Sequence, residues 1–121
     1  MGPQNVVVKG GHVPHIAADI LFDGEHITVF AAERLETRHT HGSGCIFASA
    51  LAAVLAGGQS VYESVVAARE FTRAAIRGAL PIGQGRGPAN PMAFVSDAAR
   101  VFSAILPAHQ PHASRRPEDA R

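Results

Sequence analysis

The most informative stretch of this sequence is Gly42-Ser43-Gly44-Cys45. It lies directly before a long apolar segment and contains the only cysteine of the chain. Small residues allow the backbone to turn sharply and to approach a ligand closely. The free amides of a first helical turn then point at bound negative charge, and phosphate is the natural candidate. A cysteine at this place is also a candidate proton acceptor, since the positive end of a helix favours the thiolate.

The turn by itself is weak evidence, because a single cysteine is more often a small buried residue than a catalyst. Lys9-Gly10-Gly11-His12 supports a functional interpretation, since it follows a β-branched run and open α/β sheets bind ligands beyond the carboxyl ends of their strands. Lys9 is therefore a candidate contact for a nucleotide phosphate. A solvated lysine before a turn is the alternative.

The residues upstream of the turn predict three strands. Residues 5–9 indicate a buried strand that Gly10-Gly11 ends, and residues 20–22 and 27–30 flank the strong hairpin signal Asp23-Gly24. A sheet flanked by apolar helices normally has about 5 to 6 strands. We therefore expect this chain either to pair with another copy or to be part of a larger fold.

Three helices are predicted downstream of the turn, which makes the fold an α/β or α+β layer. The first starts near Ile46 and ends at Gly57-Gly58; the second carries a capping box of Ser60 and Glu63; Asn90-Pro91 caps the third. The expected buried faces are Phe47, Ala50, Leu51, Val54 and Leu55 for the first helix, Val61, Val65, Ala68, Thr72 and Ala75 for the second, and Phe94, Val95, Ala98, Phe102 and Ile105 for the third.

Length and charge restrict the class of protein. The 121 residues suffice for one modest domain, and 11 Lys and Arg nearly balance 10 Asp and Glu, so no nucleic-acid partner is indicated. One cysteine cannot form an intramolecular disulfide, and no apolar run approaches the ~20 residues of a membrane span. We expect a cytoplasmic protein without a membrane partner. Polar residues dominate from Pro107 onward and predict a disordered tail over residues 107–121.

Two further motifs carry weaker signals. His39-Thr40-His41 lacks the third and fourth ligands of a zinc site, so no metal-binding residues are predicted. Gly83, Gly85 and Gly87 lie in a loop that no strand leads into and that Pro88 follows at once. They indicate a loop that a ligand approaches closely rather than a dinucleotide fingerprint.

Four motifs together resemble a known family in their order and spacing. They are residues 6–12 (Val-Val-Val-Lys-Gly-Gly-His), 19–24 (Asp-Ile-Leu-Phe-Asp-Gly), 40–45 (Thr-His-Gly-Ser-Gly-Cys) and 83–88 (Gly-Gln-Gly-Arg-Gly-Pro). The family is the hydroxymethylpyrimidine/phosphomethylpyrimidine kinases of thiamine biosynthesis, within the ribokinase-like superfamily. The resemblance implies that residues 1–106 are the C-terminal portion of a three-layer α/β/α kinase domain.

The resemblance also implies an activity and site residues. The activity is the ATP- and Mg²⁺-dependent phosphorylation of 4-amino-5-hydroxymethyl-2-methylpyrimidine and then of its monophosphate. Cys45 would be the catalytic base, and the amides of Gly42, Ser43 and Gly44 would form the anion hole. Lys9 would lie near the ATP phosphates. The weaker nucleotide-site candidates are Thr40, Gly83, Gly85 and Gly87.

The sequence also departs from the family pattern. Ser43 replaces a usual threonine, and His39 and Arg86 stand where an asparagine and a histidine are common. More importantly, family members begin with strands and helices that hold much of the pyrimidine pocket and part of the magnesium site. We therefore expect a truncated fragment or split-gene product that contains the nucleotide side of the site and that self-associates or requires a missing N-terminal half.

Two other functions are open at this point. The first is a pyridoxal kinase of the subgroup that shares the cysteine turn, because the pocket that distinguishes this small-molecule substrate from the pyrimidine is mostly absent from the sequence. A non-catalytic nucleotide-binding or assembly module, which docks through an exposed sheet edge, is the alternative from another class.

Overall fold

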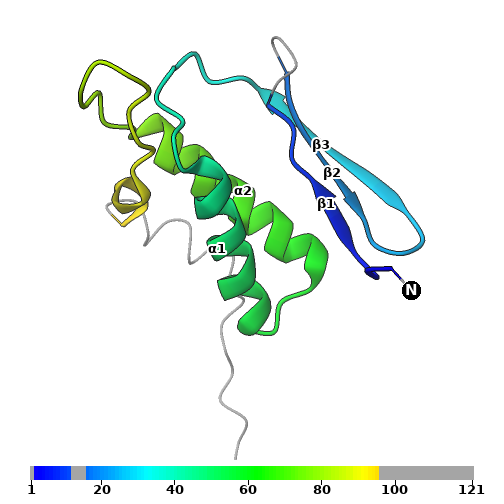
Figure 1. The fold of residues 1–121 in the computed structure, drawn as a ribbon. Coiled ribbons are helices and arrows are strands. Elements are labelled where there is room, and N and C mark those ends of the chain that lie inside the picture. Colours follow the sequence, from blue (N-terminus) through cyan, green and yellow to red (C-terminus); the bar gives the residue numbers. More distant parts are fainter. Residues whose placement is uncertain (1, 12–15, 96–121) are drawn as a thin grey trace, which may run out of the picture.

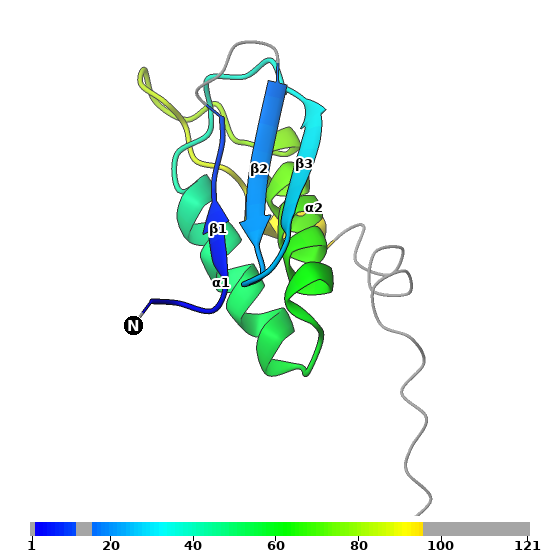
Figure 2. The ribbon, with the colours of Figure 1, turned by 90° about the vertical axis from the view of Figure 1, so that its right-hand side faces the viewer.

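The computed structural model describes residues 2–11 and 16–95, and all structural statements concern these residues. Their strands form one layer, and two helices lie side by side against one face of it (Figures 1 and 2). The elements are β1 (Val6–Val8), β2 (Ile16–Phe22), β3 (Ile27–Glu33), α1 (Ser43–Ala56), α2 (Val61–Arg77) and the 3₁₀ helix η1 (Pro91–Phe94). No helix in the described ranges combines the length and apolar character needed to cross a membrane.

The sheet is antiparallel with the order β1-β2-β3, and the predicted hairpin between β2 and β3 is confirmed. Gly24 has a φ of 102°, which favours glycine, and Oδ1 of Asp23 accepts hydrogen bonds from the amides of Glu25 (3.0 Å) and His26 (2.7 Å). Both strands extend beyond the predicted ranges through paired alanines, which are weak strand formers and gave no strand signal.

The prediction that β1 is a buried strand is wrong. Val6 and Val8 are 37% and 56% exposed, and only Val7 packs against the core. The helices cover one face of the sheet, so alternate side chains of β1 point away from them. In the described part of the chain, β1 pairs with β2 alone and forms an edge of the sheet.

Helix α1 begins earlier than predicted, because Ser43, Gly44 and Cys45 already belong to its first turn. Gly42 precedes them with a φ of 81°, a conformation that residues with a Cβ rarely adopt. Phe47 is buried, but Leu55 is exposed, which contradicts its predicted place on the buried face. Helix α1 is apolar on all sides, so the spacing of its residues does not identify one face.

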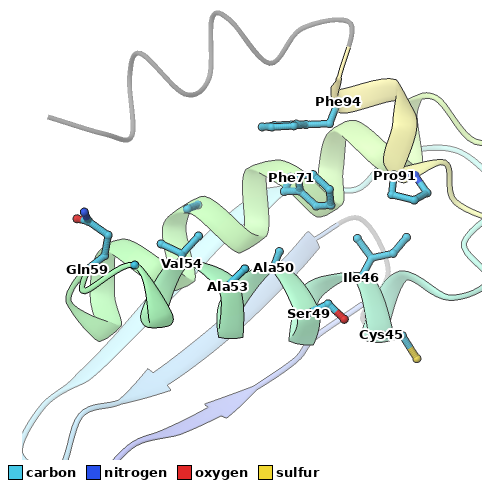
Figure 3. Close-up of a pocket in the computed structure, with 12 residues that line it drawn as sticks. Cys45, Ile46, Ser49, Ala50, Ala53, Val54, Gln59, Phe71, Pro91 and Phe94 are labelled. Atoms are coloured by element: carbon cyan, nitrogen blue, oxygen red, sulfur yellow. The ribbon is translucent and has the colours of Figure 1, made fainter. Parts of the chain in front are cut away.

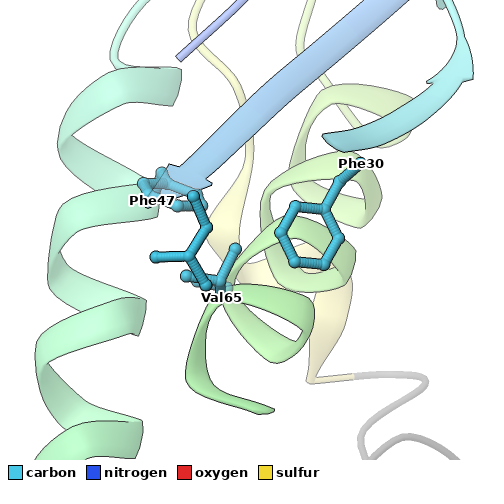
Figure 4. Packing of buried hydrophobic residues seen from close by; sticks show 5 residues of the cluster. Phe30, Phe47 and Val65 are labelled. Atoms are coloured by element: carbon cyan, nitrogen blue, oxygen red, sulfur yellow. The ribbon is translucent and has the colours of Figure 1, made fainter. Parts of the chain in front are cut away.

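The second predicted helix is confirmed as α2. Oγ of Ser60 accepts a hydrogen bond from the amide of Glu63 (3.2 Å), and the Glu63 carboxylate accepts one from the Ser60 amide (3.1 Å). The predicted face is buried apart from its half-buried first residue, Val61. In the core, Val65 of α2 lies between Phe47 of α1 and Phe30 of β3 (Figure 4).

The third predicted helix is described only at its start. Asn90 caps η1 by accepting a hydrogen bond from the amide of Met92 (3.1 Å), and Phe94 is buried against the ring of Phe71. Val95 is 60% exposed, so its predicted burial is wrong: Phe94 takes the inward side of this short turn. The remaining expected core positions, Ala98, Phe102 and Ile105, and the predicted tail lie outside the described residues.

Candidate functional site

The start of α1 presents unpaired backbone donors. The amide of Ser43 donates to the carbonyl of Thr40 (3.2 Å), and the first helical bond runs from the amide of Ile46 to the carbonyl of Gly42 (3.0 Å). Within the described chain, the amides of Gly44 and Cys45 have no hydrogen-bond acceptor, as expected for a first helical turn. These two donors are available to an anion.

A cavity of about 520 Å³ lies beside this helix start and is lined by four of the predicted site residues. Thr40, Ser43, Gly44 and Lys9 line it together. Its charged lining residues are five cations and one carboxylate, namely Lys9, Arg34, Arg69, Arg73, Arg86 and Asp19. The excess of positive charge, together with the positive end of α1, favours a polyanionic ligand.

Asp19 is the centre of a hydrogen-bond network beneath the cavity. Its Oδ2 accepts from Nζ of Lys9 (2.9 Å) and from Nε of Arg69 (2.8 Å), and its Oδ1 accepts from the amide of Gly10 (2.9 Å). Burial by itself raises the pKa of the Asp19 carboxyl, but the hydrogen bonds from Lys9, Arg69 and Gly10 outweigh it. The pKa of Asp19 therefore lies below its usual value, and the carboxylate is ionised at neutral pH.

The cationic side chains of the cavity differ in how many interactions they already make with other groups of the protein. Arg69 also donates to the carbonyl of Phe30 (2.8 Å), and Arg73 donates to the carbonyl of Glu33 (3.0 Å). Nζ of Lys9 lies 4.1 Å from the ring centre of Phe47, which fixes the ammonium from a second side. Among the described residues Arg86 has no ion-pair or hydrogen-bond partner, so its guanidinium is available to a ligand.

The glycine-rich loop is attached to the chain that leads into α1. Nδ1 of His39 accepts a hydrogen bond from the amide of Gly87 (2.9 Å), and the amide of His41 donates to the carbonyl of Gly87 (3.2 Å). A Cβ on Gly87 would lie 2.2 Å from the Leu80 carbonyl oxygen, so the loop's own packing requires glycine. Arg86 lines the cavity, whereas Gly83, Gly85 and Gly87 do not, and contact of these glycines with a ligand stays a prediction.

Cys45 lies on another side of α1. It is exposed and lines a second, apolar cavity of about 610 Å³ between α1, α2 and η1. Figure 3 shows its sulfur pointing away from Phe71 and Phe94. The structure thus brings the Cys45 amide to the start of α1 but not its thiol into the cationic cavity, and the role of Cys45 as a catalytic base stays a prediction.

The described residues do not fit a complete magnesium site. They contain no group of three or more His, Cys, Asp and Glu side chains that could hold a metal ion. The one carboxylate of the cationic cavity, Asp19, is surrounded by donors from Lys9, Arg69 and Gly10. A cation at this position would have to displace an ammonium or a guanidinium.

Sequence reasoning assigned no role to Asp19, Arg69 or His39. Their partners are 10, 50 and 48 residues away along the chain, so no local motif contains both members of a pair. One signal was present for Asp19. It stands two residues before Leu21 in β2 and therefore on the same inward face, where an acidic residue requires partners.

The fold agrees with that of a solved kinase structure. The ADP complex of Bacillus subtilis pyridoxal kinase matches with a TM-score of 0.74 and 41% sequence identity, over 78% of this chain and 38% of that chain. The protein therefore has the C-terminal part of a ribokinase-like three-layer α/β/α kinase fold, as predicted.

The family is identified by sequence. The family profile described as phosphomethylpyrimidine kinase matches residues 1–90, and the chain belongs to this family. The hydroxymethylpyrimidine/phosphomethylpyrimidine kinase of Bacillus subtilis is 45% identical over 97 residues, which are 78% of this chain and 35% of the relative. The Streptomyces coelicolor enzyme of the same name is 48% identical over 87 residues, or 72% of this chain and 32% of the relative. The chain thus spans about a third of the length of these relatives.

Proposed function

We propose that this chain supplies the ATP-phosphate side of a kinase that phosphorylates 4-amino-5-hydroxymethyl-2-methylpyrimidine and then its monophosphate. Residues 1–106 would form the C-terminal portion of the kinase domain. The observation that carries the proposal is the convergence of Gly44, whose amide is unpaired, with Lys9 and Arg86 around one cavity. Family membership supplies the reaction class.

In this proposal the chain binds and stabilises the transferring phosphoryl group. The amides at the start of α1 bind its equatorial oxygens, and Lys9 and Arg86 neutralise charge on the remaining phosphates. The substrate hydroxyl oxygen bonds to the γ-phosphorus while the bond to the bridging oxygen of ADP breaks. The hydroxyl proton passes to the thiolate of Cys45, so atoms and charges balance.

Asp19 acts as a positioning residue. It touches no phosphate, but it holds the Lys9 ammonium at 2.9 Å and prevents the side chain from swinging into solvent. A fixed cation stabilises the transition state without reorganising during the reaction. Magnesium that accompanies ATP would be held by phosphate oxygens and by parts of the kinase that lie outside the described residues.

The proposal is tested by titrating ATP and ADP into the isolated chain in a calorimeter. Lys9→Met should weaken ADP binding by about 10-fold, since it removes one charge-assisted contact. Arg77→Met changes the net charge equally but lies outside the cavity, and it should leave affinity within about twofold. An equal loss of ADP affinity in both variants, or no nucleotide binding by the wild type, would contradict the proposed nucleotide site.

Turnover is expected only together with the remaining part of the kinase fold. In that reconstituted enzyme Cys45→Ser should lower kcat more than KM, because the proton acceptor acts in the transition state. An unchanged kcat would show that Cys45 is not the proton acceptor and would favour a non-catalytic nucleotide-binding module. Full turnover by the isolated 121 residues would contradict the proposal that the chain contains only part of the active site.

Pyridoxal is the second candidate substrate, because the ADP complex of a pyridoxal kinase is 41% identical over most of this chain. Competition between the pyrimidine and pyridoxal in the reconstituted enzyme distinguishes the two. The substrate with the higher kcat/KM is the one that the enzyme uses.

A further inference from the structure

The apolar cavity of about 610 Å³ between α1, α2 and η1 is a groove that follows one face of α1, and we call it the α1 groove. Its lining residues on α1 recur four apart, as in Ile46, Ala50 and Val54, and Figure 3 shows these three in a row along the helix. The row of lining positions runs from Cys45 to Gly57, which is about 18 Å along the helix axis. Among the described residues, no charged side chain lines the groove.

The α1 groove is suited to a helix that lays an apolar face on it. Helix α1 is apolar on all sides, and a helix of this kind is normally buried all round. The core covers it only in part: Phe47 is buried there, whereas Ser49 and Ala53 in the groove are exposed. An amphipathic helix in an apolar groove is a recurring mode of recognition, with anchors at positions i, i+3 or i+4, and i+7.

The chain itself continues from the wall of the α1 groove. Phe94 of η1 lines the groove, its ring centre lies 4.6 Å from that of Phe71, and Val95 is the last described residue. Residues 96–106, Ser-Asp-Ala-Ala-Arg-Val-Phe-Ser-Ala-Ile-Leu, follow at once. As a helix, this segment would be about 16 Å long, which is close to the length of the groove.

The sequence of this segment has the pattern that the α1 groove requires. Ala98, Phe102 and Ile105 stand at positions i, i+4 and i+7, so in a helix they share one apolar face. Arg100 falls on the opposite face, and Pro107 ends the helical pattern. An apolar face with a large aromatic side chain at its centre matches the uncharged lining of the groove.

We propose that residues 96–106 lie lengthwise in the α1 groove of their own chain and bury Phe102 there. The inference goes beyond the proposed function and does not depend on it, since none of the residues that line the groove lines the cationic cavity. The segment also lies outside residues 1–90, which the family profile matches. A second copy of the chain is the competing occupant. A segment tethered at Phe94, in the groove wall, acts at an effective concentration on the order of millimolar, which favours the chain's own groove.

Tryptophan fluorescence tests the proposal in the full chain, which contains no tryptophan of its own. Phe102→Trp places a single reporter on the face expected to be buried, and His109→Trp places one in the polar stretch after Pro107. Phe102→Trp should emit at shorter wavelength, and acrylamide should quench it at least about 5-fold less effectively than His109→Trp, because a buried ring is shielded from solvent. Equal quenching of the two variants would overturn the proposal.

Ala53→Asp shows whether the reporter is buried in the α1 groove, since it places a charge in the groove at an exposed position. Ala52→Asp is the matched control, because it makes the same change at an exposed position of α1 outside the groove. Combined with Phe102→Trp, Ala53→Asp should raise quenching to the level of His109→Trp, and Ala52→Asp should leave it unchanged. Circular dichroism checks that both double variants are folded. If the two aspartates have the same effect, residue 102 is buried elsewhere and the proposal is wrong.

Dilution distinguishes the chain's own groove from that of a second copy. Quenching of Phe102→Trp should stay constant over about a 100-fold range of chain concentration, because contact within one chain does not depend on concentration. Protection that is lost on dilution, together with a falling mass in light scattering, would assign the segment to a neighbouring copy and overturn the proposal. These measurements contain no nucleotide, so a chain that fails to bind ADP would contradict the proposed function and leave this inference intact.

Discussion

The Nζ atom of Lys9 lies 2.9 Å from Oδ2 of Asp19, and this ion pair joins the residue after β1 to the inward face of β2. Because the same oxygen accepts from Nε of Arg69 on α2 at 2.8 Å, one carboxylate connects the sheet, a helix and the cationic cavity. The geometry of the site therefore depends on a residue that need not contact a ligand.

Asp19→Asn should weaken ADP binding about 3- to 10-fold and lower the free energy of unfolding by about 1.5–3 kcal/mol, since two cations lose a charged acceptor. Calorimetry and urea unfolding measure the two effects. Asp23→Asn, in the exposed hairpin turn, is the control and should leave ADP affinity unchanged. If Asp19→Asn is destabilised but binds ADP with wild-type affinity, Asp19 stabilises the fold and does not position the nucleotide site.

The stability of the chain should depend on pH through Asp19. Its pKa in the folded chain lies below the usual value of an aspartate side chain, so the carboxylate contributes stability above about pH 4. This contribution is lost as the pH falls from about 4 through the folded-state pKa. The urea midpoint of the wild type should therefore decline more steeply below pH 4 than that of Asp19→Asn. If the urea midpoints of the two proteins change with pH in parallel, the prediction that ionised Asp19 stabilises the fold is contradicted.

Gly44→Pro removes one of the two unpaired amides at the start of α1, in a helical turn where proline is tolerated. Gly44→Ala keeps the amide, and a Cβ at this position meets no atom within 4 Å. We expect Gly44→Pro to weaken ADP binding about 10-fold and Gly44→Ala to change it less than twofold. Equal affinities would show that this amide binds no phosphate. Circular dichroism checks that α1 remains folded in both.

Gly87→Ala should detach the glycine-rich loop, since the new Cβ would lie 2.2 Å from the Leu80 carbonyl oxygen and 2.7 Å from Nδ1 of His39. The expected result is faster hydrogen exchange of the residue 87 amide and weaker ADP binding, because Arg86 moves with the loop. Gly85→Ala is the control, as its Cβ has open space. An ADP affinity of Gly87→Ala equal to that of Gly85→Ala would contradict the prediction and show that Arg86 keeps its position.

Features that depend on near neighbours in the chain were predicted from sequence. The capping box joins Ser60 and Glu63, three residues apart, and the hairpin follows from Asp23-Gly24. The buried face of α1 was only partly predicted, because its apolar residues surround the whole helix. The burial of β1 was mispredicted, since a β-branched run does not reveal whether one face or both faces are covered.

By itself, the sequence determined the family, the order of strands and helices, and the placement of small residues with free amides at the start of α1. These properties reside in contiguous motifs and in hydrogen bonds over a few residues. Only the tertiary structure decided that Lys9, Asp19 and Arg69 form one network, and that Gly44 lines the cationic cavity whereas Cys45 lines the apolar one. Those relationships depend on how α1 and α2 are rotated against the sheet, which is set by packing between residues far apart in the chain.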